Sequence, residues 1–131
     1  MKKILVAFAL FIPLLFSSCT KDPCYIGSWT LTNPPWILAT TVDVDMDNTG
    51  TMIVVDPTCP ASGSQTRVYN FSWTSSDNIF AFAFSTQGKK CGESHTFTGQ
   101  EVITGLTGTL TCEGDAMTLD AATWDYHFTR N

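Results

Sequence analysis

Hydrophobic and polar positions alternate with a period of two along most of the chain after residue 25. Near the end of the chain, Trp124, Tyr126 and Phe128 share one face of an extended segment, and the residues between them are polar. The stretch from Arg67 to Thr74 repeats this design. No apolar repeat at helical spacing is longer than about two turns. The pattern predicts an all-β protein whose strands each have one buried face and one solvated face.

Eight segments show this alternation, and polar turns separate them. The predicted strands are Ile26 to Thr32, Thr40 to Met46, Gly50 to Asp56, Arg67 to Thr74, Asn78 to Ser85, Val102 to Thr111, Ala116 to Asp120 and Thr123 to Arg130. Short polar connections between successive strands are typical of hairpins. Eight strands connected in order close most economically into a single up-and-down antiparallel β-barrel, because closure removes exposed edges.

The face predicted to be inward is rich in aromatic residues. Its members are Trp29, Leu31, Met52, Val54, Tyr69, Phe71, Trp73, Phe80, Phe82, Phe84, Leu106, Leu110, Met117, Leu119, Trp124, Tyr126 and Phe128. A barrel of eight strands has room either for its own side chains or for one small ligand. In one strand the register is ambiguous, because Ala81 and Ala83 could face inward in place of the phenylalanines beside them. That register would open the interior and expose a phenylalanine stripe.

If the barrel has a cavity, its lining predicts an apolar or planar guest. The candidate ligand-binding residues are Trp36, Tyr69, Phe71, Trp73, Trp124 and Tyr126. Trp36 lies in the connection 33–38, where two prolines oppose a regular strand and three large apolar residues follow. This connection could cover a ligand, dock a partner protein or plug the barrel.

Residues 1–19 have a different composition from the rest. Two lysines precede an apolar run of about 13 residues, which is too short to cross a bilayer core of about 30 Å and is typical of an export signal. The segment from Leu15 to Cys19 resembles the lipobox of bacterial lipoproteins, in which the cysteine is lipid-modified and becomes the new N-terminus. An ordinary signal peptide cut near Ser18 is the alternative.

The lipobox resemblance implies three regions. Residues 1–18 are expected to be a lipoprotein signal peptide, 19–23 a lipidated cysteine with a short tether, and 24–131 the barrel domain. The expected location is the bacterial outer membrane, to which the lipid on Cys19 would attach the domain. The sequence is compatible with a domain that faces the periplasm and with one that faces the cell surface.

Four cysteines remain if Cys19 carries lipid, and an even number in an oxidising compartment predicts two disulfides. In a meander, every second connection lies at the same end of the barrel. Cys59 and Cys91 follow the third and fifth predicted strands, so they share one end. Cys24 precedes the first strand and Cys112 closes the sixth, so they share the other. The predicted pairs are Cys59–Cys91 and Cys24–Cys112, and an additional strand near His95 would upset this argument.

At the start of the first strand, Gly27, Ser28 and Trp29 resemble the Gly-x-Trp signature of lipocalins and the wider calycin group. Arg130 ends the last strand and resembles the basic residue that packs over that tryptophan in these proteins. The order of Cys19, a short linker and Gly-Ser-Trp is similar to that of lipocalin-like domains on bacterial lipoproteins, those of Bacteroidetes in particular. The resemblance implies a lipocalin-like barrel with a cation–π contact between Trp29 and Arg130 at its closed end.

Charge and motif content narrow the function classes. The chain has 7 basic and 12 acidic residues, two of the basic ones in the leader, so nucleic acid is not an expected partner. His95 and His127 are the only histidines and there is no Gly-x-Ser-x-Gly motif, so we expect neither an enzyme nor a cofactor. Asp43, Asp45 and Asp47 resemble the start of a calcium loop, but the glycine and glutamate that such a loop requires are missing, so we expect no metal.

Two function classes remain. The first is a lipid-anchored, non-catalytic barrel that binds a small apolar ligand. The second is a protein-interaction module or protease-inhibitor-like barrel with a filled core, whose protein partner is unknown.

Overall fold

The computed structural model describes residues 23–33 and 40–131. The elements in these ranges are the strands β1 (Gly27–Leu31), β2 (Thr40–Val44), β3 (Thr49–Val55), β4 (Thr66–Ser76), β5 (Ile79–Lys90), β6 (Glu93–Thr96), β7 (Leu106–Glu113), β8 (Ala116–Ala121) and β9 (Asp125–Arg130), with the 3-10 helix η1 (Gly99–Glu101) between β6 and β7. Within the described ranges, no helix is long and apolar enough to span a membrane.

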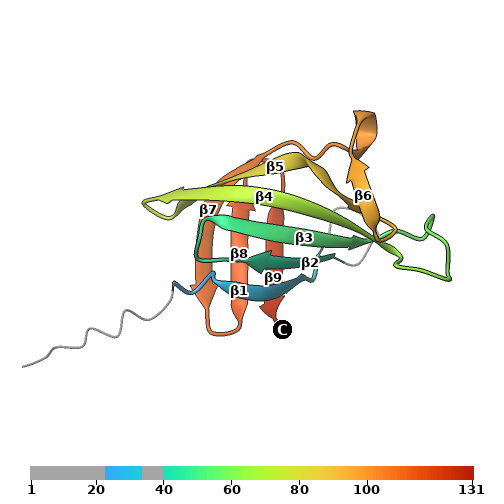
Figure 1. Ribbon diagram of the computed structural model, residues 1–131. Coiled ribbons are helices and arrows are strands. Elements are labelled where there is room, and N and C mark those ends of the chain that lie inside the picture. The colour runs from blue at the N-terminus through green and yellow to red at the C-terminus, as the bar shows by residue number, and fades with distance from the viewer. Residues whose placement is uncertain (1–22, 34–39) are drawn as a thin grey trace, which may run out of the picture.

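The strands form one antiparallel sheet in the order β4-β3-β2-β1-β9-β8-β7-β5-β6. An additional pairing between β4 and β5 closes the sheet into a barrel of eight strands, and Figure 1 shows β3 to β5 crossing β7 to β9 at a steep angle. The predicted all-β, up-and-down antiparallel barrel is therefore confirmed.

Strand boundaries differ from the prediction mainly around β5 and β7. The fifth strand extends to Lys90 instead of ending at Ser85, and β6 follows it. The predicted strand from Val102 begins only at Leu106, since residues 102–105 are irregular. The long apolar alternation of β5 ends at Phe84, so the polar part of the strand has no hydrophobic signal by which to recognise it.

The additional strand β6 leaves the direction of the following strands unchanged. It pairs with the end of β5, while β7 pairs with the beginning of β5, and both run antiparallel to it. Thus β6 and β7 act as one interrupted strand with η1 in the interruption. The alternation of barrel ends is kept, and both predicted disulfides, Cys24–Cys112 and Cys59–Cys91, are present.

The core follows the predicted face of each strand, with one exception. Phe80 is buried, and Phe82 and Phe84 pack against the core, so the register with Ala81 and Ala83 inward is wrong. Trp124 was expected inside and is instead 42% exposed. It precedes β9 in a turn in which Ala121 and Trp124 exchange backbone hydrogen bonds, so strand alternation does not apply to it.

One end of the barrel is closed by the segment that leads into β1. Trp29 is fully buried, and its indole N–H donates to the carbonyl of Tyr25 at 2.9 Å. The guanidinium of Arg130 lies 4.3 Å from the centre of the Trp29 ring, which confirms the expected cation–π contact. Arg130 also donates to the carbonyls of Ile26 and Cys24, at 3.1 and 2.8 Å. We call this the closed end, and the opposite end, where β3 and β5 finish, the far end.

Candidate functional site

The barrel interior contains a small apolar cavity, about 50 Å³ in volume. It lies among side chains from β1 to β5 and from β7 to β9. Its lining is Leu31, Val42, Val44, Met52, Phe71, Phe82, Phe84, Leu106, Leu110, Met117, Leu119, Tyr126 and Phe128. The phenol of Tyr126 is the one polar group among these side chains, and burial raises its pKa.

This volume sets a limit on what the interior can hold. A water molecule needs about 10–15 Å³ of such space, and pockets for drug-sized ligands are about 300–1,000 Å³. Aromatic side chains fill most of the barrel, with Phe71 touching Phe82 and Phe84 at centroid distances of 5.5 Å. The interior therefore has room for a small apolar group and not for a whole fatty acid or retinoid without side-chain movement.

The six predicted ligand-binding residues have different positions. Phe71 and Tyr126 line the cavity. Tyr69 and Trp73 are buried but lie outside it, and the Trp73 indole N–H is shared between the carbonyls of Asp45 and Thr49, both at 3.2 Å. Trp124 lies on the surface, and its indole N–H donates to the carbonyl of Asn33. Trp36 lies outside the described residues.

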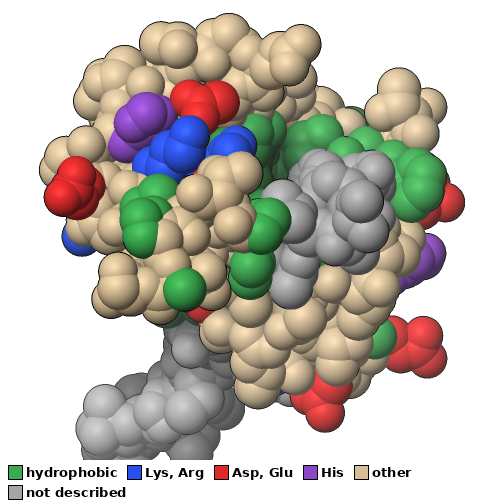
Figure 2. Space-filling model, turned by 90° about the vertical axis from the view of Figure 1, so that its right-hand side faces the viewer, with side chains coloured by type: hydrophobic (Ala, Val, Ile, Leu, Met, Phe, Trp, Pro, Cys, Tyr) green, Lys and Arg blue, Asp and Glu red, His purple; other side chains and the backbone are tan. Residues whose placement is uncertain are grey.

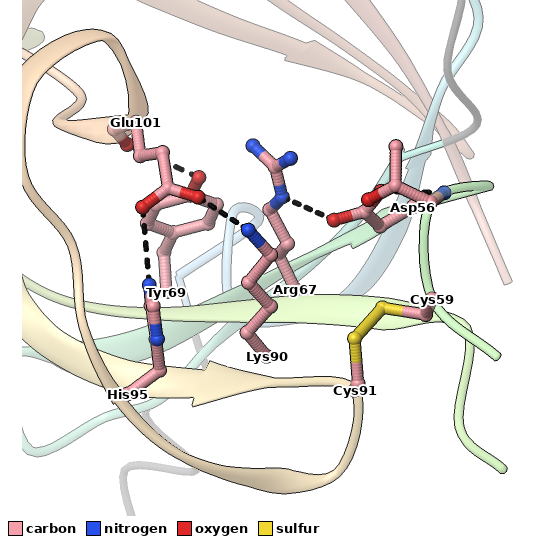
Figure 3. A network of polar contacts seen from close by, with 9 residues as sticks. Asp56, Cys59, Arg67, Tyr69, Lys90, Cys91, His95 and Glu101 are labelled. Carbon is pink, nitrogen blue, oxygen red and sulfur yellow. Dashed lines mark hydrogen bonds and ion pairs between the residues drawn. A yellow bond between two sulfur atoms is a disulfide. The ribbon is translucent and has the colours of Figure 1, made fainter.

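A polar network lies at the far end of the barrel (Figure 3). The carboxylate of Glu101 accepts from Lys90 Nζ at 2.6 Å and lies 3.0 Å from His95 Nε2. Hydrogen bonds from Lys90 and then from His95 lower the pKa of Glu101 to about 2. The phenol of Tyr69 donates to the backbone carbonyl of Glu101 at 3.1 Å. The network thus fastens η1 to β4, β5 and β6.

The buried side chain of Phe97 packs the same segment against the barrel. It is 1% exposed and stacks on Tyr69 with ring centroids 4.2 Å apart. Gly88 makes room for it, since a side chain at that position would lie 2.7 Å from the Phe97 ring and 2.2 Å from the carbonyl oxygen of Val68. Phe97 is not recognisable from the sequence, because a single apolar residue among polar ones has no period to detect.

A second ion pair lies next to the Cys59–Cys91 disulfide. Asp56 is 1% exposed, and its carboxylate accepts from the Thr58 hydroxyl and the Thr58 backbone N–H at 2.5 and 2.9 Å. Arg67 Nε donates to the other carboxylate oxygen at 2.5 Å. The Thr58 hydroxyl and Arg67 lower the pKa of Asp56 to about 2, against the opposing effect of burial.

Figure 2 shows the far end of the barrel directly. Lysine, arginine, histidine and acidic side chains gather on one side, and hydrophobic side chains lie beside them. Two sets of ion pairs lie at this end, Lys90 and His95 with Glu101, and Arg67 with Asp56. In the part of the chain that the structure describes, no group of three or more His, Cys, Asp or Glu is placed to hold a metal ion.

Of the aspartates that resemble the start of a calcium loop, Asp47 has a side-chain contact, and that contact stabilises a turn. The carboxylate of Asp47 accepts from the backbone N–H and the hydroxyl of Thr49, and this closes the turn between β2 and β3.

No protein-family model, curated protein or solved structure matches the chain.

Proposed function

We propose that this protein is a non-catalytic, lipocalin-like lipoprotein of the bacterial outer membrane that binds a small apolar group inside its barrel. The observation that carries the proposal is the cavity of about 50 Å³, lined by apolar side chains and the Tyr126 ring. Apolar cavities in close-packed proteins stay dry and take up apolar guests. The lipocalin-like assignment is supported by the closed barrel and by the contact of Arg130 with Trp29.

The cavity can adapt to more than one guest. Met52 and Met117 are on its wall, and methionine side chains are flexible and polarisable. Phe84 is only partly buried, so its ring is not fully enclosed by the core and can move. We expect guests no larger than a short branched alkyl group to enter without rearrangement, and a ring-sized guest to require movement of Phe84.

Xenon tests this proposal because it is small, apolar and chemically inert. The full chain with Cys19→Ser, which removes any attached lipid, is labelled at its methyl groups and placed under xenon pressure. We expect saturable shifts for the methyls of Leu31, Val44, Met52 and Met117, which line the cavity. Methyl groups outside the cavity, such as those of Val54, serve as the internal reference.

A matched pair of variants sharpens the test. Leu110→Ala enlarges the cavity, whereas Val54→Ala removes buried methyls that do not line it. Both should lower the free energy of unfolding, by about 1–4 kcal/mol. Only Leu110→Ala should gain binding of benzene. Absence of xenon shifts in the parent together with equal benzene binding by the two variants would contradict an interior binding site.

The second candidate function is a protein-interaction or protease-inhibitor-like module. The observation that favours it is that three of the five exposed large hydrophobic residues of the described ranges, Val55, Val102 and Trp124, belong to connections or strand ends at the far end; the other two, Met46 and Ile79, lie at the closed end. Such residues can form a contact surface on a filled barrel. If the interior takes up neither xenon nor benzene, inhibition of secreted proteases by the parent and by Trp124→Ser becomes the decisive comparison.

A further inference from the structure

The pairing of β4 with β5 contains one irregularity. Their pairing shifts register between Tyr69 and Phe71. Along this stretch β4 has only Asn70, whereas β5 has the residues 85–87. Such a bulge bends the bulged strand and increases its local twist. Within this irregular stretch, the Asn70 side chain donates from Nδ2 to the carbonyl of Gln87 at 3.2 Å.

An open groove of about 590 Å³ lies on the outer face at this bulge. Hydroxyl and amide residues line it, namely Thr49, Thr51, Asn70, Ser72 and Ser85, and Gly50, Phe71, Ala83 and Phe84 also border it. A second hollow of about 440 Å³ shares Thr51 and Asn70 with the first.

The second hollow continues the groove toward β6. Its further lining includes Gln87, Lys89 and Ser94. Together the two hollows cross β3, β4, β5 and β6, which lie next to one another in the sheet. Three gaps between neighbouring strands correspond to about 14 Å. The groove is therefore long enough for a short chain of sugar rings.

We propose that this groove binds a neutral oligosaccharide. Hydroxyl and carboxamide groups both donate and accept hydrogen bonds, as the hydroxyls of a sugar do. The residues 70 and 85–87 are placed at a bulge, a feature that often re-aims side chains toward a ligand. The proposal does not depend on a guest inside the barrel.

The charges of the groove argue against other ligand classes. Asp45 lines only the first hollow and Lys89 only the second, so the groove has one charge of each sign and no cationic cluster. A phosphate or polyanionic ligand would require several cations. A purely apolar ligand would leave the hydroxyls and amides without water or partners.

The test uses the full chain with Cys19→Ser, labelled with ¹⁵N, and three neutral probes: maltotetraose, cellotetraose and chitotetraose. We expect at least one of them, at millimolar concentration, to shift the amide signals of Thr51, Asn70 and Ser85 in a saturable way. Asn70→Ala should weaken that binding about tenfold. Thr51→Ala is the second variant, because Asn70→Ala also removes the bridge to Gln87.

Thr111→Ala is the matched control, since Thr111 is an exposed threonine on β7, away from the groove. It should bind like the parent. An anionic oligogalacturonate should bind no better than the neutral probes. The proposal is overturned if none of the neutral probes shifts these amides, if Thr51→Ala and Asn70→Ala bind like Thr111→Ala, or if only the anionic probe binds.

Discussion

At the scale of single residues, Trp29 is the most consequential side chain of the closed end. It is fully buried, and its indole N–H is satisfied by Tyr25 while Arg130 covers its ring. Arg130 connects the ring to the backbone of the entering segment through Cys24 and Ile26. The two residues thus hold the first and last strands together with the segment that precedes β1.

Replacing Trp29 by alanine removes this whole arrangement. We expect Trp29→Ala to lower the free energy of unfolding by about 3–5 kcal/mol, because it creates a cavity and leaves the Tyr25 carbonyl without its donor. Trp124→Ala is the matched control, because that tryptophan is 42% exposed, and it should cost about 1 kcal/mol or less. Urea unfolding of both variants measures the difference. Equal stability of Trp29→Ala and the parent would exclude the proposed role of the signature residue.

The carboxylate of Asp56 makes the stability of the fold depend on pH in the acid range. Its pKa is about 2 in the folded protein, below the ordinary value of 3.8. The stabilisation is therefore present above about pH 4 and is lost as the pH falls through 2. Because Arg67 is partly exposed to solvent, we expect this carboxylate to contribute about 1–2 kcal/mol.

The measurement is the free energy of unfolding between pH 2 and pH 5. Asp56→Asn should be less stable than the parent at pH 5 and should lose less stability on acidification. Glu101 also has a lowered pKa of about 2, so the stabilisation that its carboxylate provides is lost in the same pH range. Glu101→Gln therefore serves as the comparison, and identical pH profiles for the parent and Asp56→Asn would refute the assignment to Asp56.

At the scale of elements, the segment from β6 through η1 is an addition fastened to a complete barrel. Phe97 anchors it by stacking on Tyr69, and Glu101 ties it to Lys90 and His95. Phe97→Ala should cost about 3–4 kcal/mol, mainly through local opening of this segment. Hydrogen exchange should become faster in β6 and stay unchanged in β8 and β9. Val102→Ala, which truncates an exposed side chain of the same segment, should leave exchange as in the parent.

Sequence periodicity predicted the elements whose two faces differ and missed those without such a difference. The barrel, the inward phenylalanines of β5 and both disulfides followed from alternation and from the parity of connections. Trp124 was misplaced because it belongs to a turn. Phe97 was missed because it is an isolated apolar residue, and the bulge opposite Asn70 was missed because it depends on how two strands pair. Periodicity shows which face of a strand is buried, but it does not show where a bulge inserts extra residues into one strand of a pair.

At the scale of the whole molecule, the two barrel ends have different roles. The chain enters at the closed end, where Cys24 is joined to Cys112 and Arg130 holds the entering segment. From Cys19 to Pro23 an extended chain spans at most about 14 Å. If Cys19 carries the lipid, as we propose, the closed end must face the membrane. The far end, with the ion pairs of Glu101 and Asp56, then points away from the bilayer.

This orientation predicts a difference between two added tryptophans. Asp115→Trp places a ring in the turn between β7 and β8 at the closed end, and Ala122→Trp places one in the turn between β8 and β9 at the far end. In vesicles carrying the lipidated protein and a headgroup-linked quencher, the fluorescence added by Asp115→Trp should be quenched strongly and that added by Ala122→Trp weakly. Cys19→Ser, which cannot be lipidated, should abolish quenching of both. Stronger quenching at position 122 would mean that the far end faces the membrane, which a tether of this length does not permit.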